Sequence, residues 1–462
     1  LLVTVTIALF FSYGHLLEVV IDLGDTISQF EKWPHTSLMW ILGVVWLIAS
    51  YRIFRSKNEF PRLTQLLNYL GVILVLIQIG SAGYATMGRS SVELTRPTIT
   101  VGDMLLEEPP DVYYIILDGY GRHDVLGEIY DYDNSATLDH LREKGFFVAD
   151  SAHSNYPQTL LSLTSSLNLN YIDSLGMFDR TSVDRVPLAD LYQTNAVFEF
   201  FQSIGYRIVT FSTGYRLSDF TDPDVNLAPK SDLSEFAALV YSTTPLAYVR
   251  GSFESRYNRE RDRIRFIFSK LPKITEAPSP FFVFAHILAP HPPFMFDENG
   301  NDFQLERAFT HGDGHHYIGS TEEYLTGYRN QIRVVDSLLI ETIDSILARH
   351  KDKPPIIIVQ GDHGPGSRLH WNSLAKTYVK ERLGILNAYY LPGLDSLPIY
   401  TNISPVNTFR VILNSYFGTD YELLSDNAYY VVWAFPYQFQ DVTDRLDLPY
   451  TPPLDSADIL LE

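Results

Sequence analysis

Cysteine is absent from all 462 residues. The chain therefore has no disulfides, no thiolate metal site and no cysteine nucleophile. Positive charge is also scarce, because 35 Lys and Arg stand against 55 Asp and Glu, for a formal net charge of -20. A chain without a basic surplus cannot neutralise many phosphates, so no nucleic-acid partner is expected. The sequence does not indicate an oligomeric state.

Charge is missing locally as well, over three apolar stretches near the start: residues 1–17, 33–51 and 63–88. A membrane-spanning helix needs about 20 mostly apolar residues. The second and third stretches therefore predict transmembrane helices, and the first indicates a span that is truncated, as expected of a fragment or processed chain. The alternative is a buried helix of a soluble protein, but two such stretches are hard to bury in one small region.

The loops between these stretches predict an orientation. Arg52, Arg55, Lys57 and Arg62 lie between the second and third stretches, whereas the first loop is mainly acidic. Basic loops stay on the cytoplasmic side. The chain after about residue 90 is then extracytoplasmic, or periplasmic, beyond an inner (plasma) membrane. The first stretch lacks the basic start and small-residue cleavage site of a signal peptide.

The rest of the chain alternates strand and helix patterns. Four short apolar runs predict strands buried on both faces: 111–117, 206–211, 281–287 and 355–360. Helical patterns cover 195–205, 255–271 and about 320–349. This order predicts an α/β fold, an α/β/α sandwich with a largely parallel central sheet. The expected organisation is transmembrane helices over 1–90, a linker over 91–110, a catalytic domain over 111–445 and an acidic tail over 446–462.

Chemistry-bearing side chains follow three of these strands. Asp118 follows the first, Asp362 and His363 follow the last, and His286 and His291 lie at or after the third. Ligands bind at the carboxyl ends of the strands in such sheets. Carboxylate oxygen and imidazole nitrogen together suit Zn²⁺ or Mn²⁺ better than Ca²⁺. The pattern predicts a divalent-metal site there, although each residue alone is also explained as a turn or a core side chain.

A hydroxyl nucleophile is predicted at Thr159, which opens an apolar helical stretch after Pro157 and Gln158. A helix N-terminus carries a positive potential that favours an alkoxide and an incoming anion. The alternative for Thr159 is a simple N-cap.

The chain resembles the alkaline phosphatase superfamily in the order of its motifs. These are strand-LDG, a Thr at a helix start, HILAPHPPF and VQGDHG. Within it the chain is similar to the membrane-anchored sulfatase-like branch, which includes lipoteichoic acid synthases and phosphoethanolamine transferases. The resemblance covers about 111–420. It includes GYRNQIRVVDSLLIETI, which is similar to a family helix that carries a Tyr and an Asp beside the site.

The resemblance implies roles for individual residues. It makes Thr159 the nucleophile and a metal ligand, beside the ligands Asp118, Asp362 and His363. His286 and His291 match catalytic histidines that bind substrate phosphate or a second metal, and His370 loosely matches a later histidine. The transferases mostly use Glu where this chain has Asp118, which leaves the metal open. The chain lacks the Cys or Ser of a formylglycine motif, so sulfate hydrolysis is disfavoured.

The resulting expectation is a metal-dependent extracytoplasmic phosphotransferase, moving a phospho-alcohol head group from a lipid of the bilayer to an acceptor. The substrate is expected to be a lipid- or sugar-linked phosphate. The alternatives are a hydrolase of phosphodiesters, phosphate or sulfate esters on the same scaffold, and an inactive membrane-anchored binding protein. The loop HGDGHH, with His311, Asp313, His315 and His316, is expected to be solvated and substrate-facing rather than a metal site.

Overall fold

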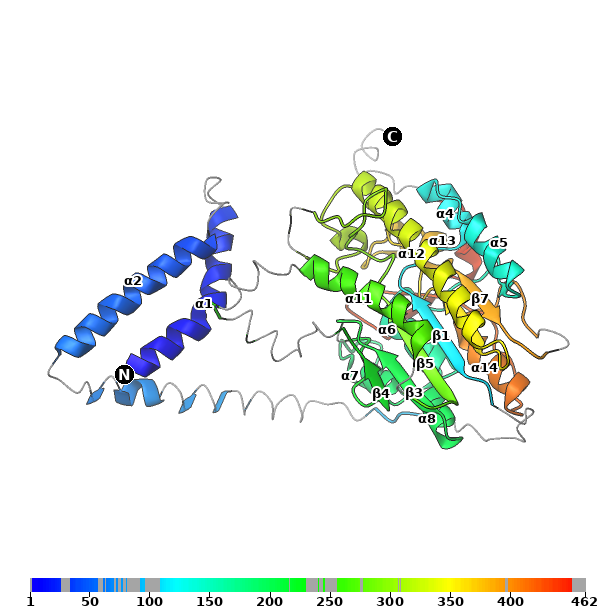
Figure 1. Ribbon diagram of the computed structural model, residues 1–462, viewed down its shortest axis with the longest axis horizontal. Coiled ribbons are helices and arrows are strands. Elements are labelled where there is room, and N and C mark those ends of the chain that lie inside the picture. The colour runs from blue at the N-terminus through cyan, green and yellow to red at the C-terminus, as the bar shows by residue number, and fades with distance from the viewer. Residues whose placement is uncertain are drawn as a thin grey trace. The chain divides into compact units, whose positions relative to one another are not determined.

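The computed structural model describes most of the chain: residues 2–25, 34–56, 61–62, 64–69, 72–73, 76–77, 80, 92–95, 109–215, 217–229, 240, 244–245, 256–274, 277–305, 307, 309–394 and 398–450. The chain divides into two compact units (Figure 1). One contains 1–90 and 230–259, and the other contains 91–229 and 260–462. The predicted stretch 63–88, the linker 91–110 and the tail from 446 lie largely or partly outside the described residues.

The N-terminal unit contains two long helices, α1 (Leu2–Asp25) and α2 (Pro34–Arg55). They contact each other, and Trp46 Nε1 donates to Thr6 Oγ1 at 2.8 Å. In the described part of the chain, one helical segment is long and apolar enough to cross a membrane. It is Leu38–Arg55, with a mean hydropathy of 1.5 and 11% of it buried. A shorter apolar helix covers Leu2–Gly14. Because so little of Leu38–Arg55 is buried, its apolar side chains are suited to an apolar environment.

The larger unit is built on a seven-stranded sheet in the order β2-β7-β6-β1-β5-β3-β4. The strands are β1 (Val112–Leu117), β2 (Phe147–Val148), β3 (Arg207–Phe211), β4 (Val225–Leu227), β5 (Phe281–Ile287), β6 (Ile356–Gln360) and β7 (Asn387–Tyr390). The strands from β6 to β4 in this order run parallel, while β7 is antiparallel to β6 and to β2. The predicted α/β fold with a largely parallel sheet is confirmed.

Helices cover the sheet. They are α4 (His123–Tyr130), α5 (Ser135–Glu143), α6 (Thr159–Leu167), α7 (Val186–Gln193), α8 (Ala196–Ser203), α11 (Arg256–Lys270), α12 (Thr321–Arg349), α13 (Val379–Leu383) and α14 (Pro405–Tyr416). A small hairpin adds β8 (Tyr429–Val431) and β9 (Phe439–Asp441). The predicted helices over 195–205, 255–271 and 320–349 all form, and each observed end lies within two residues of the predicted end.

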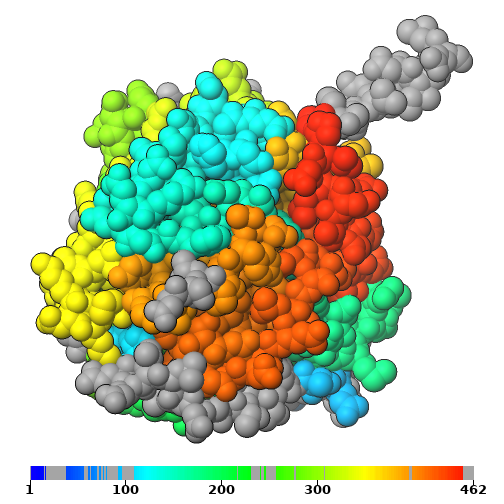
Figure 2. Space-filling view, turned by 90° about the vertical axis from the view of Figure 1, so that its right-hand side faces the viewer, coloured from blue at the N-terminus to red at the C-terminus, as the bar shows by residue number. Residues whose placement is uncertain are grey.

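Alternation along β1 separates two faces. Val112, Tyr114 and Ile116 enter a core with side chains of α6, α8 and α14. Tyr113 points to the other face, where its ring lies 5.9 Å from that of His350, just after α12. Because both faces are covered, every residue of β1 and of β6 is buried, which explains their continuous apolar sequences. In Figure 2, segments that are distant in sequence, coloured cyan to teal and orange, lie side by side on one face. The pairing of β2 with β7 joins these two parts of the chain.

Candidate metal centre and cavity

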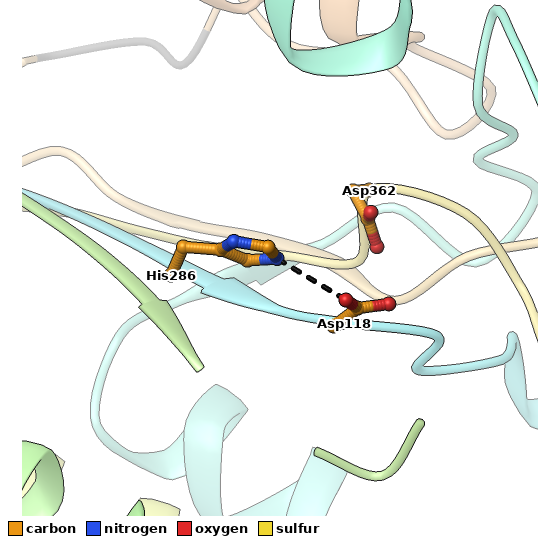
Figure 3. Close-up of side chains that lie close together, drawn as sticks. All are labelled: Asp118, His286 and Asp362. Atoms are coloured by element: carbon orange, nitrogen blue, oxygen red, sulfur yellow. Dashed lines mark ion pairs between the residues drawn. The ribbon is translucent and has the colours of Figure 1, made fainter. Parts of the chain in front are cut away.

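Three buried side chains meet where β1, β5 and β6 lie side by side. Asp118, His286 and Asp362 each offer a ligand atom, and these atoms lie within 4.8 Å of one another. Figure 3 shows the imidazole of His286 directed at Asp118, with His286 Nε2 at 3.4 Å from Asp118 Oδ2. The register aligns the strands for this, because Ile116 pairs with His286 on one side and with Gln360 on the other. His286 and Asp362, which lie 168 and 244 positions after Asp118 in the sequence, are thereby brought to one point with it.

The orientation of Asp362 is fixed by main-chain hydrogen bonds. Its Oδ1 accepts from Gly119 N at 3.1 Å and from His363 N at 2.9 Å. Its Oδ2, Asp118 Oδ1 and both ring nitrogens of His286 are buried without a hydrogen-bond partner among the described residues. Buried polar atoms are normally paired. Two carboxylate oxygens and an imidazole left unpaired together fit a divalent cation with oxygen and nitrogen ligands.

His363 presents its Nε2 to the same place. Its Nδ1 lies 3.0 Å from the carbonyl oxygen of Gly364, to which it can donate. The other nitrogen lies 3.3 Å from Asp362 Oδ2 and 3.6 Å from Asp118 Oδ1. Burial, followed by the charge of Arg382, lowers the pKa of His363. A neutral imidazole that donates from Nδ1 keeps a lone pair on Nε2, as a metal ligand requires.

Thr159 is the first residue of α6, and its Oγ1 lies 3.2 Å from His363 Nε2. Gln158 is the N-cap, so the hydroxyl of Thr159 is not the cap. Helix α6 and the segment before it are also tied to the loop that follows β6. Ser162 Oγ and Ser154 Oγ donate to the carbonyl oxygen of Asp362 at 2.6 and 2.5 Å. The structure thus places the predicted nucleophile beside His363, one of the predicted ligands, and it adds two serines that carried no signal in the sequence.

The charges of the cluster stabilise one another. Burial raises the pKa of Asp118, but His291, His286 and His363 outweigh burial and hold this pKa well below its usual range. Burial alone would lower the pKa of His286, yet the contact with Asp118 raises it. The carboxylate of Asp118 is therefore charged, as a ligand must be.

Glycines around the ligands have different roles. Gly119 has φ +74°, a left-handed conformation that lets the chain turn after Asp118. Gly361 and Gly364 are required by close packing rather than by a turn. A Cβ on Gly364 would lie 2.1 Å from the carbonyl oxygen of Glu381, and one on Gly361 would lie 2.6 Å from that of Tyr120. Such distances exclude a side chain, so the backbone around Asp362 and His363 depends on both glycines.

A cavity of about 210 Å³ opens beside the cluster. Its lining includes Asp118, Thr159, His291 and His363, together with His311, Asp313, His316 and Arg382. Asp313 accepts from Arg382 Nη1 and from Tyr324 OH, both at 2.7 Å, and lies 3.7 Å from His291 Nε2. Nothing in the sequence around Arg382 marks it, because it lies in a short segment, VKERL, without a motif.

The loop 311–316 is mixed in its exposure. His315 and His316 are exposed, as expected, but Asp313 is buried. His370 lies with this loop, since its ring stacks on that of His315 with centroids 3.9 Å apart and 2° between the planes. It is not part of the Asp118, His286 and Asp362 group.

Helix α12 supports the turn after Asp118. Tyr328 OH accepts from Gly121 N at 3.1 Å and donates to the carbonyl oxygen of Gly119 at 2.9 Å. Asp336 accepts from Tyr120 OH at 2.5 Å and from Tyr132 OH at 2.7 Å. This is the helix whose Tyr and Asp were expected beside the site.

The buried Asp336 predicts a pH effect on stability. Burial raises its pKa from 3.8 to about 6, so folding favours the protonated form. Its contribution is fully present below pH 3.8 and is lost as the pH rises through about 6. From about pH 7.5 to 5, the wild type should gain about 1–2 kcal/mol of unfolding free energy relative to Asp336→Asn. Urea unfolding of the full chain at both pH values measures this. Asp352→Asn, at an exposed site, is the control, and equal pH dependence of wild type and Asp336→Asn would refute the assignment.

The α/β sandwich and the match to a family model over more than half of the chain together place this protein among the enzymes of the alkaline phosphatase superfamily. The profile of the family described as Sulfatase matches residues 110–382, and the chain belongs to that family. No curated protein sequence matches the chain.

Solved structures show weak similarity, with TM-scores below 0.5. The C-terminal periplasmic domain of EptC from Escherichia coli, in complex with zinc, has a TM-score of 0.48 and 14% identity, covering 77% of this chain and 98% of that one. Phosphoethanolamine transferase A from Neisseria meningitidis, an integral membrane protein, has a TM-score of 0.39 and 14% identity. The match covers 77% of this chain and 61% of that one. A putative sulfatase from Bacteroides thetaiotaomicron has a TM-score of 0.44 and 13% identity, and the match covers 71% of this chain and 74% of that one.

Proposed function

We propose that this chain is a metal-dependent phosphotransferase in which Thr159 is the nucleophile. The observation that carries the proposal is the position of Thr159 Oγ1 at the start of α6, 3.2 Å from His363 Nε2. Asp118 Oδ1 and Asp362 Oδ2, the two unpaired carboxylate oxygens, lie beside the same imidazole. A hydroxyl at a helix N-terminus beside such a cluster is suited to covalent catalysis.

Asp118, Asp362 and His363 are the proposed metal ligands, with Thr159 completing the set. His286 is a further ligand, since its ring nitrogens are buried beside Asp118 without a hydrogen bond. This oxygen and nitrogen set favours Zn²⁺ or Mn²⁺. When bound, such a cation lowers the pKa of a neighbouring hydroxyl and neutralises charge on a phosphoryl oxygen.

The reaction proceeds by two displacements. Thr159 Oγ1 gives its proton to His291, which lines the same cavity, and attacks phosphorus in line with the leaving alcohol. The phosphorus–oxygen bond to that alcohol breaks as a phosphothreonine forms. His291 donates a proton to the leaving alkoxide, because it lines the cavity whereas His286 does not. An acceptor hydroxyl then attacks the phosphothreonine, and the phosphorus–oxygen bond to Thr159 breaks. The proton of the acceptor passes through His291 to Thr159 Oγ1, which restores the hydroxyl. Two inversions give retention of configuration at phosphorus.

A lipid donor is proposed because of the N-terminal unit. The apolar helix Leu38–Arg55 can anchor the chain in a bilayer, which brings phospholipid head groups within reach of a tethered domain. The proposed organisation keeps transmembrane helices over 1–90, a linker over 91–110, an extracytoplasmic catalytic domain over 111–445 and an acidic tail over 446–462.

Hydrolysis is the second candidate, because water can replace the acceptor hydroxyl in the second displacement. The family name favours ester hydrolysis, but Thr159 cannot become the formylglycine of sulfatases, so a phosphodiester substrate is preferred to a sulfate ester. A binding protein without activity has no need for an unpaired buried cluster next to a hydroxyl.

The test uses the full chain in detergent with phospholipid labelled in its head-group phosphate. We expect diacylglycerol to appear with transfer of label to an added sugar or lipid acceptor when Zn²⁺ or Mn²⁺ is present, and neither product after treatment with EDTA. Release of the label as a free phospho-alcohol would make the protein a hydrolase. Failure of both metals to support turnover of the lipid and of chromogenic phosphodiesters would refute the proposal.

A further inference from the structure

A second cavity, of about 410 Å³, opens in the larger unit. Its lining comes from the segment 294–305, which follows β5, and from Tyr317, Ser320 and the first three turns of α12. It shares no lining residue with the cavity that contains Thr159. Pockets for small organic molecules usually measure about 300–1,000 Å³ and have largely apolar walls. The second cavity has this size, and the proposed reaction does not use it.

The apolar part of the lining is aromatic. Phe294, Phe296 and Phe303 all contribute to it. The ring of Phe294 lies directly against α12 at Gly327, where a Cβ would come within 2.2 Å of Phe294 Cδ2. Glycine weakens the interior of a helix, and here it makes room for the ring. Phe303 keeps 41% of its surface exposed. A large apolar side chain left open in a concave site can cover the apolar part of a ligand.

The charged part of the lining is acidic. Asp297, Glu298, Glu322 and Glu323 line the pocket, and no Lys, Arg or His does so in the part of the chain that the structure describes. Glu323 is compensated, because its Oε1 accepts from Arg307 Nη2 at 2.5 Å. The side chains of Glu298 and Glu322 make no hydrogen bond or ion pair with any described residue. Their charges are therefore left for a ligand.

The cations near the pocket do not cancel this charge. Arg261 and Arg265 both pair with Asp302, just outside the lining, at 3.4 and 2.6 Å. Arg329 approaches through Nη2, which donates to Thr326 Oγ1 at 3.3 Å. With the ion pair described above, these four guanidinium groups stand against five carboxylates. A site with an excess of negative charge favours a cation over an anion.

The aromatic rings also attract cations. Arg265 Cζ lies 5.3 Å from the centroid of the Phe296 ring, and Arg307 Cζ lies 5.0 Å from that of Tyr317. Phe303 has no such cation over its ring among the described residues. Its ring is therefore available to a cationic ligand, and this attraction adds to that of a carboxylate.

We propose that this pocket binds an organic ammonium ion with an apolar body. Glu298 and Glu322 compensate its charge, and its apolar body lies on Phe303 and the neighbouring rings. The site is separate from the metal centre, and the inference does not depend on the proposed function.

The test uses the full chain in detergent and two probes of similar shape. 4-Phenylbutylammonium is positively charged at neutral pH, whereas 4-phenylbutan-1-ol is neutral. EDTA removes any metal that an amine could ligate. Binding is followed by saturation-transfer NMR, with protein-free micelles as the background. We expect the ammonium ion to bind about 5- to 10-fold more tightly than the alcohol, the combined effect of a partly exposed ion pair and a cation–π contact.

Two variants localise the binding. Glu298→Gln combined with Glu322→Gln removes both charges and keeps the shape of the side chains. The ammonium ion should then lose most of its advantage, while the affinity for the alcohol stays within about twofold. Thr326→Trp, at an exposed position of the lining, should block the pocket and weaken binding of both probes by more than about tenfold.

Glu341→Gln is the matched control. Glu341 is also an exposed acid of α12, but it does not line the pocket. Its replacement should change neither affinity by more than about twofold. All variants should keep the melting temperature of the wild type, because the replaced side chains are exposed.

Three results would overturn the inference. Equal affinity of the wild type for the two probes would show that the pocket does not select a cation. Selectivity retained without Glu298 and Glu322 would place the recognition of charge elsewhere, and unchanged binding to Thr326→Trp would place the probes outside the pocket. None of these results bears on Thr159 or on the metal, since the experiment contains no metal and measures no turnover.

Discussion

Replacement of Thr159 by Ala is expected to reduce turnover of a phosphodiester by on the order of 10³-fold or more, because the alanine side chain has no hydroxyl to form the proposed covalent intermediate. The fold should survive, since the side-chain hydroxyl makes one described contact, with His363. The melting temperature should therefore stay near that of the wild type while kcat falls. Steady-state kinetics with bis(4-nitrophenyl) phosphate and Zn²⁺ or Mn²⁺ measure the effect.

Two variants control this experiment. Thr159→Ser keeps a hydroxyl and should retain far more activity than the alanine variant. Thr164 is in the same helix but is buried away from the cavity. Thr164→Val removes a hydroxyl while keeping the shape of the side chain, and it should leave kcat unchanged. Turnover by Thr159→Ala at more than about a tenth of the wild-type rate would exclude Thr159 as the nucleophile.

Asp362→Ala is expected to weaken binding of Zn²⁺ or Mn²⁺ by more than about 100-fold, a larger loss than that of residues that only orient ligands. The purified full chain should then contain little metal by mass spectrometry, and its activity should be lost. The alanine also leaves the N–H groups of Gly119 and His363 without their acceptor, which destabilises the fold by about 1–3 kcal/mol for each buried group.

Asp362→Asn separates these two effects. An amide oxygen still accepts from both N–H groups, but the side chain no longer carries the negative charge. We expect loss of metal with little loss of stability. Asp336→Asn is the control, because Asp336 is also a buried carboxyl but both its oxygens accept hydrogen bonds from tyrosines. A stoichiometric metal content in Asp362→Asn would show that the cation lies elsewhere.

The sequence alone was sufficient to predict the largely parallel sheet, and it indicated the edge at which the candidate site lies. The runs of β1, β5 and β6 are mostly apolar, and each has an acid or an imidazole at or just after its carboxyl end. Since parallel strands in one sheet end at the same edge, Asp118, Asp362 and His363 were expected at one edge. Their proximity also requires that β1 and β6 be neighbours, which the strand order of the sheet shows. Thr159 could be placed by its position at a helix start and by the order of motifs.

Only the tertiary structure decided which partners complete the site. His286 was expected to bind substrate or a second metal, and its place opposite Asp118 follows from the register of β1 and β5. Asp313 and Arg382 are 69 residues apart and meet through a loop and a short helix. Strand patterns are local, and a sequence reveals them directly. Contacts between loops depend on how the whole sheet and its helices pack, and no local pattern encodes them.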